Sequence, residues 1–141
     1  MGANFLIDTG AILAILDAKD RWHAKCLDTF VQLRLPALTS EAVLTEVFHL
    51  VKRSRTEMDT VWKFLRSGGV VLGPIEHSEL PDIRALMMRY ADRPMDFADA
   101  TLVHLAGREA IDTILTVDQA DFWVYRISGK RRFRVLPIER P

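Results

Sequence analysis

Two aspartates in this sequence stand directly after short apolar segments of the kind that form buried strands. Asp8 follows Phe5-Leu6-Ile7, and Asp118 follows the segment from Thr113 to Val117. The carboxyl ends of parallel strands meet at one edge of a sheet, and paired strands lie about 5 Å apart. If these two strands are neighbours, both carboxylates can reach one metal ion. The alternative is that each aspartate only caps the helix that follows it.

Three further acids lie in predicted helices. Glu46 belongs to the apolar segment 41–52, where a half-buried carboxylate must be paired with a cation or bound to a ligand. Asp96 and Asp99 follow Pro94 in a pattern close to a capping box, which makes Asp96 the expected N-cap. A helix N-terminus also favours anions and metal–phosphate clusters. We therefore expect Asp96 to cap the helix while Asp99 binds metal.

These acids predict chemistry on phosphate esters with a hard divalent cation. Magnesium prefers oxygen ligands and usually keeps several waters, so one or two carboxylates can hold it. Two such ions about 4 Å apart can activate a water and stabilise the leaving oxygen of a phosphodiester. Manganese suits the same ligands. The four histidines form no paired motif that would support a rival metal site: His23, His49, His77 and His104.

The composition is that of an ordinary soluble protein. With 141 residues, 49% of them apolar, we expect one domain spanning residues 1–141. Its net charge is zero, so overall charge neither favours nor excludes a polyanionic partner. A single cysteine, Cys26, excludes an intrachain disulfide. We find no signal peptide or membrane-spanning segment and expect a cytoplasmic protein with no membrane partner.

The elements that must position the acids alternate between strands and helices along the whole chain. Apolar runs predict strands at 4–7, 37–39, 70–72, 113–117 and 133–136. Helical periodicity predicts helices at 11–17, from Asp20 as N-cap to before Pro36, at 41–52, around 58–65, at 80–90 and at 97–108. This alternation predicts an α/β fold with a mostly parallel sheet covered on both faces.

Basic residues gather near the C-terminus. They are Arg126, Lys130, Arg131, Arg132 and Arg134. One interpretation is that they bind nucleic-acid phosphates beside the acids, which would make binding salt-dependent. The other is that they are solvated charges protecting the last strand from pairing with another chain.

In their order and spacing, the motifs of this chain resemble the PIN domain, and more narrowly the VapC-type ribonuclease toxins of toxin–antitoxin pairs. The resemblance rests on Phe5-Leu6-Ile7-Asp8-Thr9, on Glu46, on Met95-Asp96-Phe97-Ala98-Asp99-Ala100, and on Leu115-Thr116-Val117-Asp118 with Asp121-Phe122 behind it. Each motif is weak alone, and together they span nearly the whole chain. No catalytic acid of the family pattern is missing.

The resemblance implies a PIN-like three-layer α/β/α fold with a five-stranded, mostly parallel sheet. It also implies an endoribonuclease that needs Mg²⁺ or Mn²⁺ and leaves a 5′-phosphate and a 3′-hydroxyl. Asp8, Glu46, Asp99 and Asp118 match the catalytic acids. Asp8 and Asp99 are then the main metal ligands with Asp96 accessory to them, and the supporting residues are Thr9, Thr116 and Asp121. The implied partners are an RNA substrate, a VapB-type antitoxin and a second copy in a homodimer.

Two other enzyme classes fit the sequence less well. A haloacid-dehalogenase-type phosphatase needs a second aspartate two residues after Asp8, where the chain has Gly10. A receiver domain needs an aspartate after a middle strand, where Val70 to Leu72 lead to Gly73-Pro74. The remaining alternative is a catalytically inactive PIN-like module that binds RNA or protein and uses its acids only as caps and ion-pair partners.

Overall fold

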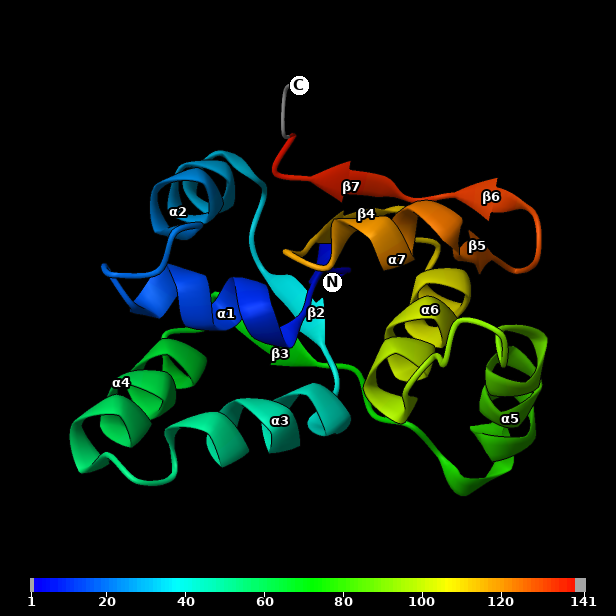
Figure 1. Cartoon of the computed structure of the whole chain (residues 1–141), viewed down its shortest axis with the longest axis horizontal. Coiled ribbons are helices and arrows are strands. Elements are labelled where there is room, and N and C mark those ends of the chain that lie inside the picture. Colours follow the sequence, from blue (N-terminus) through cyan, green and yellow to red (C-terminus); the bar gives the residue numbers. More distant parts are fainter. Residues whose placement is uncertain (1, 139–141) are drawn as a thin grey trace.

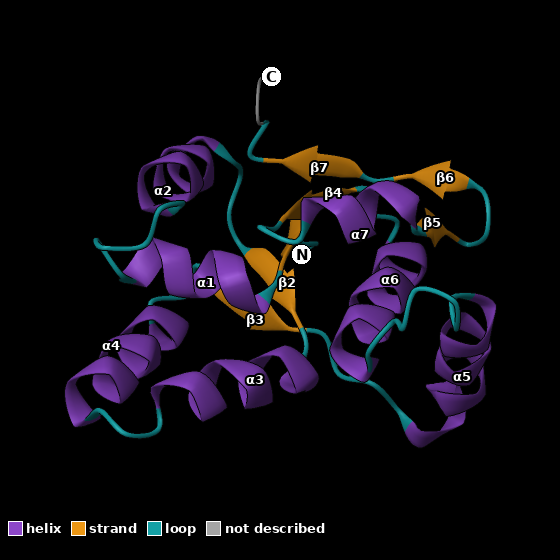
Figure 2. Ribbon diagram, in the orientation of Figure 1, coloured by secondary structure: helices purple, strands orange, loops and turns teal. Residues whose placement is uncertain are grey.

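A computed structural model describes residues 2–138 and shows a five-stranded sheet flanked by helices on both sides (Figures 1 and 2). The strand order is β3-β2-β1-β4-β7, and all neighbouring strands of this sheet are parallel. The strands are β1 (Phe5–Ile7), β2 (Ala37–Thr39), β3 (Val70–Leu72), β4 (Thr113–Leu115) and β7 (Arg134–Leu136). The predicted α/β fold with a five-stranded parallel sheet is confirmed.

Helices connect the strands and cover the sheet. They are α1 (Thr9–Leu16), α2 (His23–Gln32), α3 (Glu41–Val51), α4 (Arg55–Arg66), the 3₁₀ turn η1 (His77–Glu79), α5 (Leu80–Arg89), α6 (Phe97–Glu109) and α7 (Gln119–Val124). Every residue of β1, β2 and β4 is buried, as expected for strands covered on both faces. Among residues 2–138, no helix is long and apolar enough to cross a bilayer.

The chain reverses its direction across the sheet next to β1. It runs outward from β1 to β2 and β3, then returns past β1 to β4 and finally to β7. In open parallel sheets a crevice forms at such a switch point, beyond the carboxyl ends of the strands. The switch point lies between β1 and β4, and Asp8 and Asp118 follow these two strands; we call the place where the acids gather beyond it the acidic crevice.

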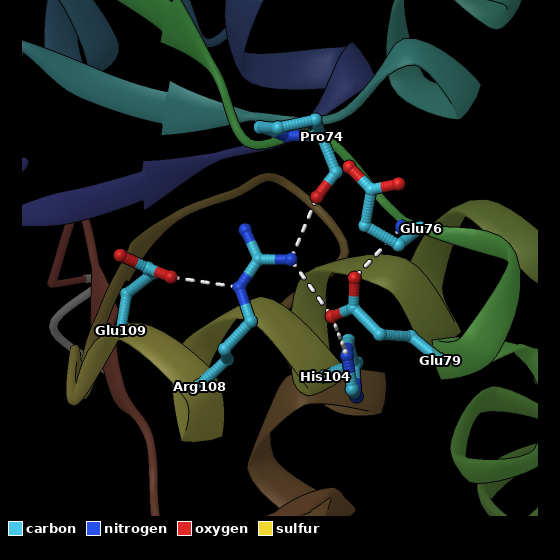
Figure 3. A network of polar contacts seen from close by, with 6 residues as sticks. All are labelled: Pro74, Glu76, Glu79, His104, Arg108 and Glu109. Carbon is cyan, nitrogen blue, oxygen red and sulfur yellow. Dashed lines mark hydrogen bonds and ion pairs between the residues drawn. The ribbon is translucent and has the colours of Figure 1, made fainter.

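A network of polar contacts holds α6 against the segment that follows β3 (Figure 3). One Glu79 carboxylate oxygen, Oε1, lies 2.7 Å from His104 Nε2 and accepts a 2.8 Å hydrogen bond from Arg108, which also donates to the Pro74 carbonyl at 2.6 Å. Hydrogen bonds from the Glu76 backbone, His104 and Arg108 lower the pKa of Glu79 to about 2. The C-terminal half of α6 is thereby fixed, with its N-terminus at the crevice.

Two parts of the fold differ from the sequence-based expectation. Asp20 is not the N-cap of α2, because its carboxylate accepts from the Trp22 N–H at 2.8 Å and closes a turn before the helix begins at His23. The region after Asp118 contains α7 and an antiparallel hairpin of β5 (Arg126–Ile127) and β6 (Arg131–Arg132). These strands have two residues each, which is too short to show an alternating pattern.

Replacing Leu105 should test how far the core of α6 supports the sheet. Leu105 is fully buried, so Leu105→Ala should lower the free energy of unfolding by about 2–5 kcal/mol. Leu50 is 62% exposed, and Leu50→Ala should change the free energy of unfolding by no more than about 0.5 kcal/mol. Urea unfolding of both variants measures the two values, and equal losses would contradict the assigned core.

Candidate active site

The register of β1 against β4 places Asp8 opposite Thr116. Leu6 pairs with Ile114 and Ile7 with Leu115, so the next residue of each strand stands at the same edge of the sheet. Across this edge the Thr116 hydroxyl donates to Asp8 Oδ2 at 2.5 Å. The two strands are therefore neighbours, as the metal-site interpretation required, and Thr116 rather than Asp118 makes the direct contact with Asp8.

Asp8 is the most buried acid of the crevice, with 4% of its surface exposed. Its second oxygen accepts from the Gly10 N–H at 3.0 Å, so Asp8 also caps α1. A Cβ at Gly10 would overlap the Val117 side chain, and only glycine lets α1 start this close to the end of β4. Burial is the main cause that raises the pKa of Asp8 to about 7, and the nearby charge of Asp118 adds to it.

Asp96 and Asp99 divide the two roles that the sequence suggested for this pair. Asp96 is the N-cap of α6 and accepts from the Asp99 N–H at 2.8 Å. Asp99 is half-buried, and its Oδ2 accepts from the Tyr125 hydroxyl at 3.1 Å. Burial, followed by the charges of Asp96 and Asp8, raises the pKa of Asp99 to about 8.

Glu46 and Asp118 lie at the exposed rim of the same crevice. Glu46 on α3 accepts from the Thr9 hydroxyl at 3.1 Å, which joins α3 to the start of α1. Asp118 precedes α7 but its side chain makes no capping bond, so the capping alternative does not hold for it. Partial desolvation, followed by neighbouring carboxylates, raises the pKa of both groups.

The acids form one negative cluster without a cationic partner. Four of the acids have raised pKa values, and in each case a carboxylate from a different segment of the chain contributes to the rise. These four are Asp8, Glu46, Asp99 and Asp118. Within residues 2–138, no lysine or arginine forms an ion pair with any of these four or with Asp96. Carboxylates held this close together in a partly buried site favour binding of a cation.

The arrangement fits a hydrated divalent ion better than an ion enclosed by protein ligands. In the part of the chain that the structure describes, no three acid, histidine or cysteine side chains converge tightly enough to form a complete ligand set. Magnesium usually keeps several waters and needs only one or two carboxylates. Asp8 and Asp99 supply such oxygens, and each already has one oxygen oriented by a hydroxyl. The residues present therefore fit Mg²⁺ or Mn²⁺.

Tyr125 and Arg93 are site residues that the sequence analysis missed. Tyr125 is buried and packs edge-on against Tyr90 and Phe122, which points its hydroxyl at Asp99. Arg93 pairs with Asp121 at 2.9 Å, beside Asp118. Neither residue belongs to a recognisable motif. Each can be assigned to the site only from its position in the folded chain.

The basic C-terminal residues do not surround the acids. Arg126 donates to the backbone carbonyls at the end of α7, and Arg131 pairs with Asp112 at 3.1 Å. A Cβ at Gly107 would touch Ser128 of the hairpin turn, which places the hairpin at the C-terminal end of α6, whereas Asp99 lies at its N-terminal end (Figure 1). This position favours the interpretation that the hairpin cations are solvated surface charges.

The fold is that of a known protein family. The PIN domain family matches residues 5–128, and the chain belongs to this family. It is 33% identical over 138 residues to Ribonuclease VapC26 of Mycobacterium tuberculosis (strain ATCC 25618 / H37Rv), a match covering 94% of this chain and 99% of that protein. The crystal structure of Mycobacterium tuberculosis VapC20, described as a sarcin–ricin loop cleaving toxin, shares the fold with a TM-score of 0.71. That match has 19% identity and covers 79% of this chain and 87% of VapC20.

Burial of Asp8 and Asp99 should make the stability of the metal-free protein fall with rising pH. Their pKa values rise from 3.8 to about 7 and about 8, so between pH 4 and pH 8 the folded state holds protons that the unfolded chain has released. Each such proton contributes a slope of up to about 1.4 kcal/mol per pH unit. Urea unfolding in EDTA across this range measures the slope.

The neutral variant Asp8→Asn supplies the matched comparison. It keeps the shape of the side chain without the charge, so at pH 8 it should unfold with a free energy about 1 kcal/mol or more above that of the wild type. At pH 3, below the pKa of Asp8 in both the folded and the unfolded state, the two proteins should be nearly equal. A variant that is less stable than the wild type at pH 8 would contradict the raised pKa of Asp8.

Proposed function

We propose that the protein is a divalent-metal-dependent endoribonuclease and the toxin of a VapBC-type toxin–antitoxin pair. The observation that carries this proposal is the convergence of Asp8, Glu46, Asp99 and Asp118 at the switch point of the sheet, where no lysine or arginine among residues 2–138 forms an ion pair with them. Membership of the PIN domain family and the likeness to Ribonuclease VapC26 support the choice of RNA as substrate.

In this proposal Asp8 and Asp99 hold Mg²⁺ or Mn²⁺, and Asp96 is an accessory ligand. When bound, such an ion would supply Lewis-acid chemistry for attack of water on a phosphodiester. Thr116 fixes the orientation of Asp8, and Tyr125 does the same for Asp99. The expected products carry a 5′-phosphate and a 3′-hydroxyl.

Glu46 and Asp118 complete the negative rim. Thr9 holds the Glu46 carboxylate toward α1, and the Thr116 hydroxyl accepts from the Asp118 N–H at 2.9 Å. Because the same threonine contacts both Asp8 and Asp118, a shift of either acid would disturb the other. Asp121 supports the site indirectly by holding Arg93 at its border.

The proposed partners follow from the family of relatives. VapC20 is described as cleaving the sarcin–ricin loop, and VapC26 as a ribonuclease. We propose that this chain likewise acts on RNA, is held inactive by a VapB-type antitoxin and works as a homodimer.

Cleavage of a mixed RNA pool tests the catalytic proposal. Purified protein free of antitoxin should produce discrete fragments with Mg²⁺ or Mn²⁺ and none with EDTA. Asp8→Asn should reduce cleavage by about 100-fold or more, because loss of even an outer contact to a metal ligand costs about 10- to 100-fold. Fragment ends are read by sequencing, which also identifies the target.

A folded Asp8→Asn variant serves as the control for structure in this experiment. Circular dichroism and urea unfolding should show that it keeps the fold. If metal-loaded wild type leaves all RNA intact and calorimetry detects no binding of Mn²⁺, the protein is an inactive PIN-like binding module and the proposal is wrong.

Arg93 is the cation best placed to contact an RNA phosphate beside the acids. It is exposed, and its partner Asp121 lies next to the cluster. Removing one arginine charge that contacts a phosphate of single-stranded RNA should reduce the slope of log Kd against the logarithm of the salt concentration by about 0.7. Arg93→Gln, made in the Asp8→Asn background to prevent cleavage, should show this reduction.

Arg132→Gln is the matched control, because Arg132 is an exposed arginine on the distant hairpin. Made in the same Asp8→Asn background, this variant should show the same slope of log Kd against log salt as the Asp8→Asn protein itself. A reduced slope for Arg132→Gln with no change for Arg93→Gln would instead favour the prediction that Arg126, Lys130, Arg131, Arg132 and Arg134 bind the RNA backbone.

A further inference from the structure

A groove opens beside the acidic crevice, between the first turns of α3 and α6. Its volume is about 490 Å³, and its walls include Ala42 and Thr45 from α3 and Phe97 and Ala98 from α6. A hydrogen bond of 2.7 Å between the buried Ser40 and Thr101 hydroxyls joins the N-cap of α3 to α6, the two helices that form the groove.

Phe97 gives this groove an aromatic wall. It is the first residue of α6 and 46% of its surface is exposed, so a face of its ring is available to a ligand in the groove. The alanines Ala42 and Ala98 leave the space beside the ring open. Proteins that bind single-stranded RNA stack unpaired bases on exposed aromatic rings of this kind.

The polar atoms around the ring are mainly acceptors. Glu41, in the first turn of α3, has an exposed carboxylate with no hydrogen-bond partner among residues 2–138. Glu46 and Asp96 add further carboxylates, and the Thr45 hydroxyl already donates its proton to the Glu41 carbonyl at 3.1 Å. An ionised carboxylate accepts hydrogen bonds and donates none.

This chemistry selects what can occupy the groove. The carboxylates repel the phosphates of RNA, so a nucleotide must enter with its uncharged base. Guanine presents two adjacent donors on its Watson–Crick edge, N1–H and the 2-amino group, and one carboxylate can accept both. Uracil presents a single N–H between two carbonyl acceptors, which face the carboxylates unfavourably.

We propose that the groove is a nucleobase subsite that binds a guanine next to the cleaved phosphate, with the base stacked on Phe97 and its donors on Glu41. Glu46 and Asp96 line both the groove and the acidic crevice, so a nucleotide in the groove is adjacent to the site of cleavage. The inference rests on the proposed ribonuclease function and adds the base specificity of the same site.

Cleavage of a random single-stranded RNA pool, read by sequencing, tests the preference. Wild type should enrich guanine at one position beside the cut. Phe97→Leu should raise KM about tenfold through loss of one base stack, with little change in kcat. Glu41→Gln should abolish the guanine enrichment while the rate on the pool stays within about threefold, since Glu41 is not among the proposed metal ligands.

Substitutions of two exposed residues outside the groove, matched to Phe97 and Glu41, serve as controls. Trp62 is an exposed aromatic residue at 53%, and Glu57 is the acid in the first turn of α4. Trp62→Leu and Glu57→Gln should leave KM and base preference unchanged. If wild type shows no enrichment of guanine, or if the enrichment survives Glu41→Gln, the subsite is overturned while the nuclease proposal stands.

A binding measurement separates the subsite from catalysis. In EDTA, guanosine should shift the backbone amide NMR signals of Ala42, Thr45 and Ala98 in wild type but not in Phe97→Leu. Inosine, which lacks the 2-amino group, should bind more weakly, and uridine should cause no shift. If guanosine causes these shifts but no RNA is cleaved, the nuclease proposal fails and the subsite stands. If guanosine causes none, the subsite is overturned.

Discussion

The pairing of β1 with β4 is the constraint on which the site depends. It buries the Asp8 carboxyl against Thr116, where ionisation is disfavoured by the loss of solvent and by the charge of Asp118. A buried carboxylate without a cation opposes folding. The apolar residues that precede it offset this, because all of β1 and β4 is buried. The fully buried strands β1 and β4 therefore meet at an edge of the sheet where a carboxylate charge is unfavourable.

The other acids are held by helix starts that converge on this point. The Ser40–Thr101 hydrogen bond joins the first turns of α3 and α6, and the Glu79–His104–Arg108 network fixes the far end of α6. Because α6 is held at both ends, Asp99 cannot move away from the charge of Asp8 to relieve repulsion. Sites built on rigid elements keep such strained geometry better than sites on loops.

The sequence predicted the strands, their parallel pairing and the acids that meet, because those features follow from buried apolar runs and from residues at strand ends. It did not predict Tyr125, whose role depends on how α7 packs against Tyr90 and α6. It also did not reveal that the hairpin packs at the C-terminal end of α6, since a run of basic residues does not show where its hairpin docks. Local patterns determine elements, whereas packing determines which elements meet.

The gradient of exposure across the acids suggests an order of events. Asp8 is buried, Asp99 is half-buried, and Glu46, Asp96 and Asp118 lie at the rim. Without a cation, this rim would repel an RNA backbone from Asp8. Once an ion is held by the inner acids, a phosphate becomes favourable at that point alone, while Glu41 and its neighbours still repel phosphate from the adjoining groove. In the proposed function, the same negative charge would thus require the metal to bind before the RNA and would determine which part of a nucleotide can enter each half of the site.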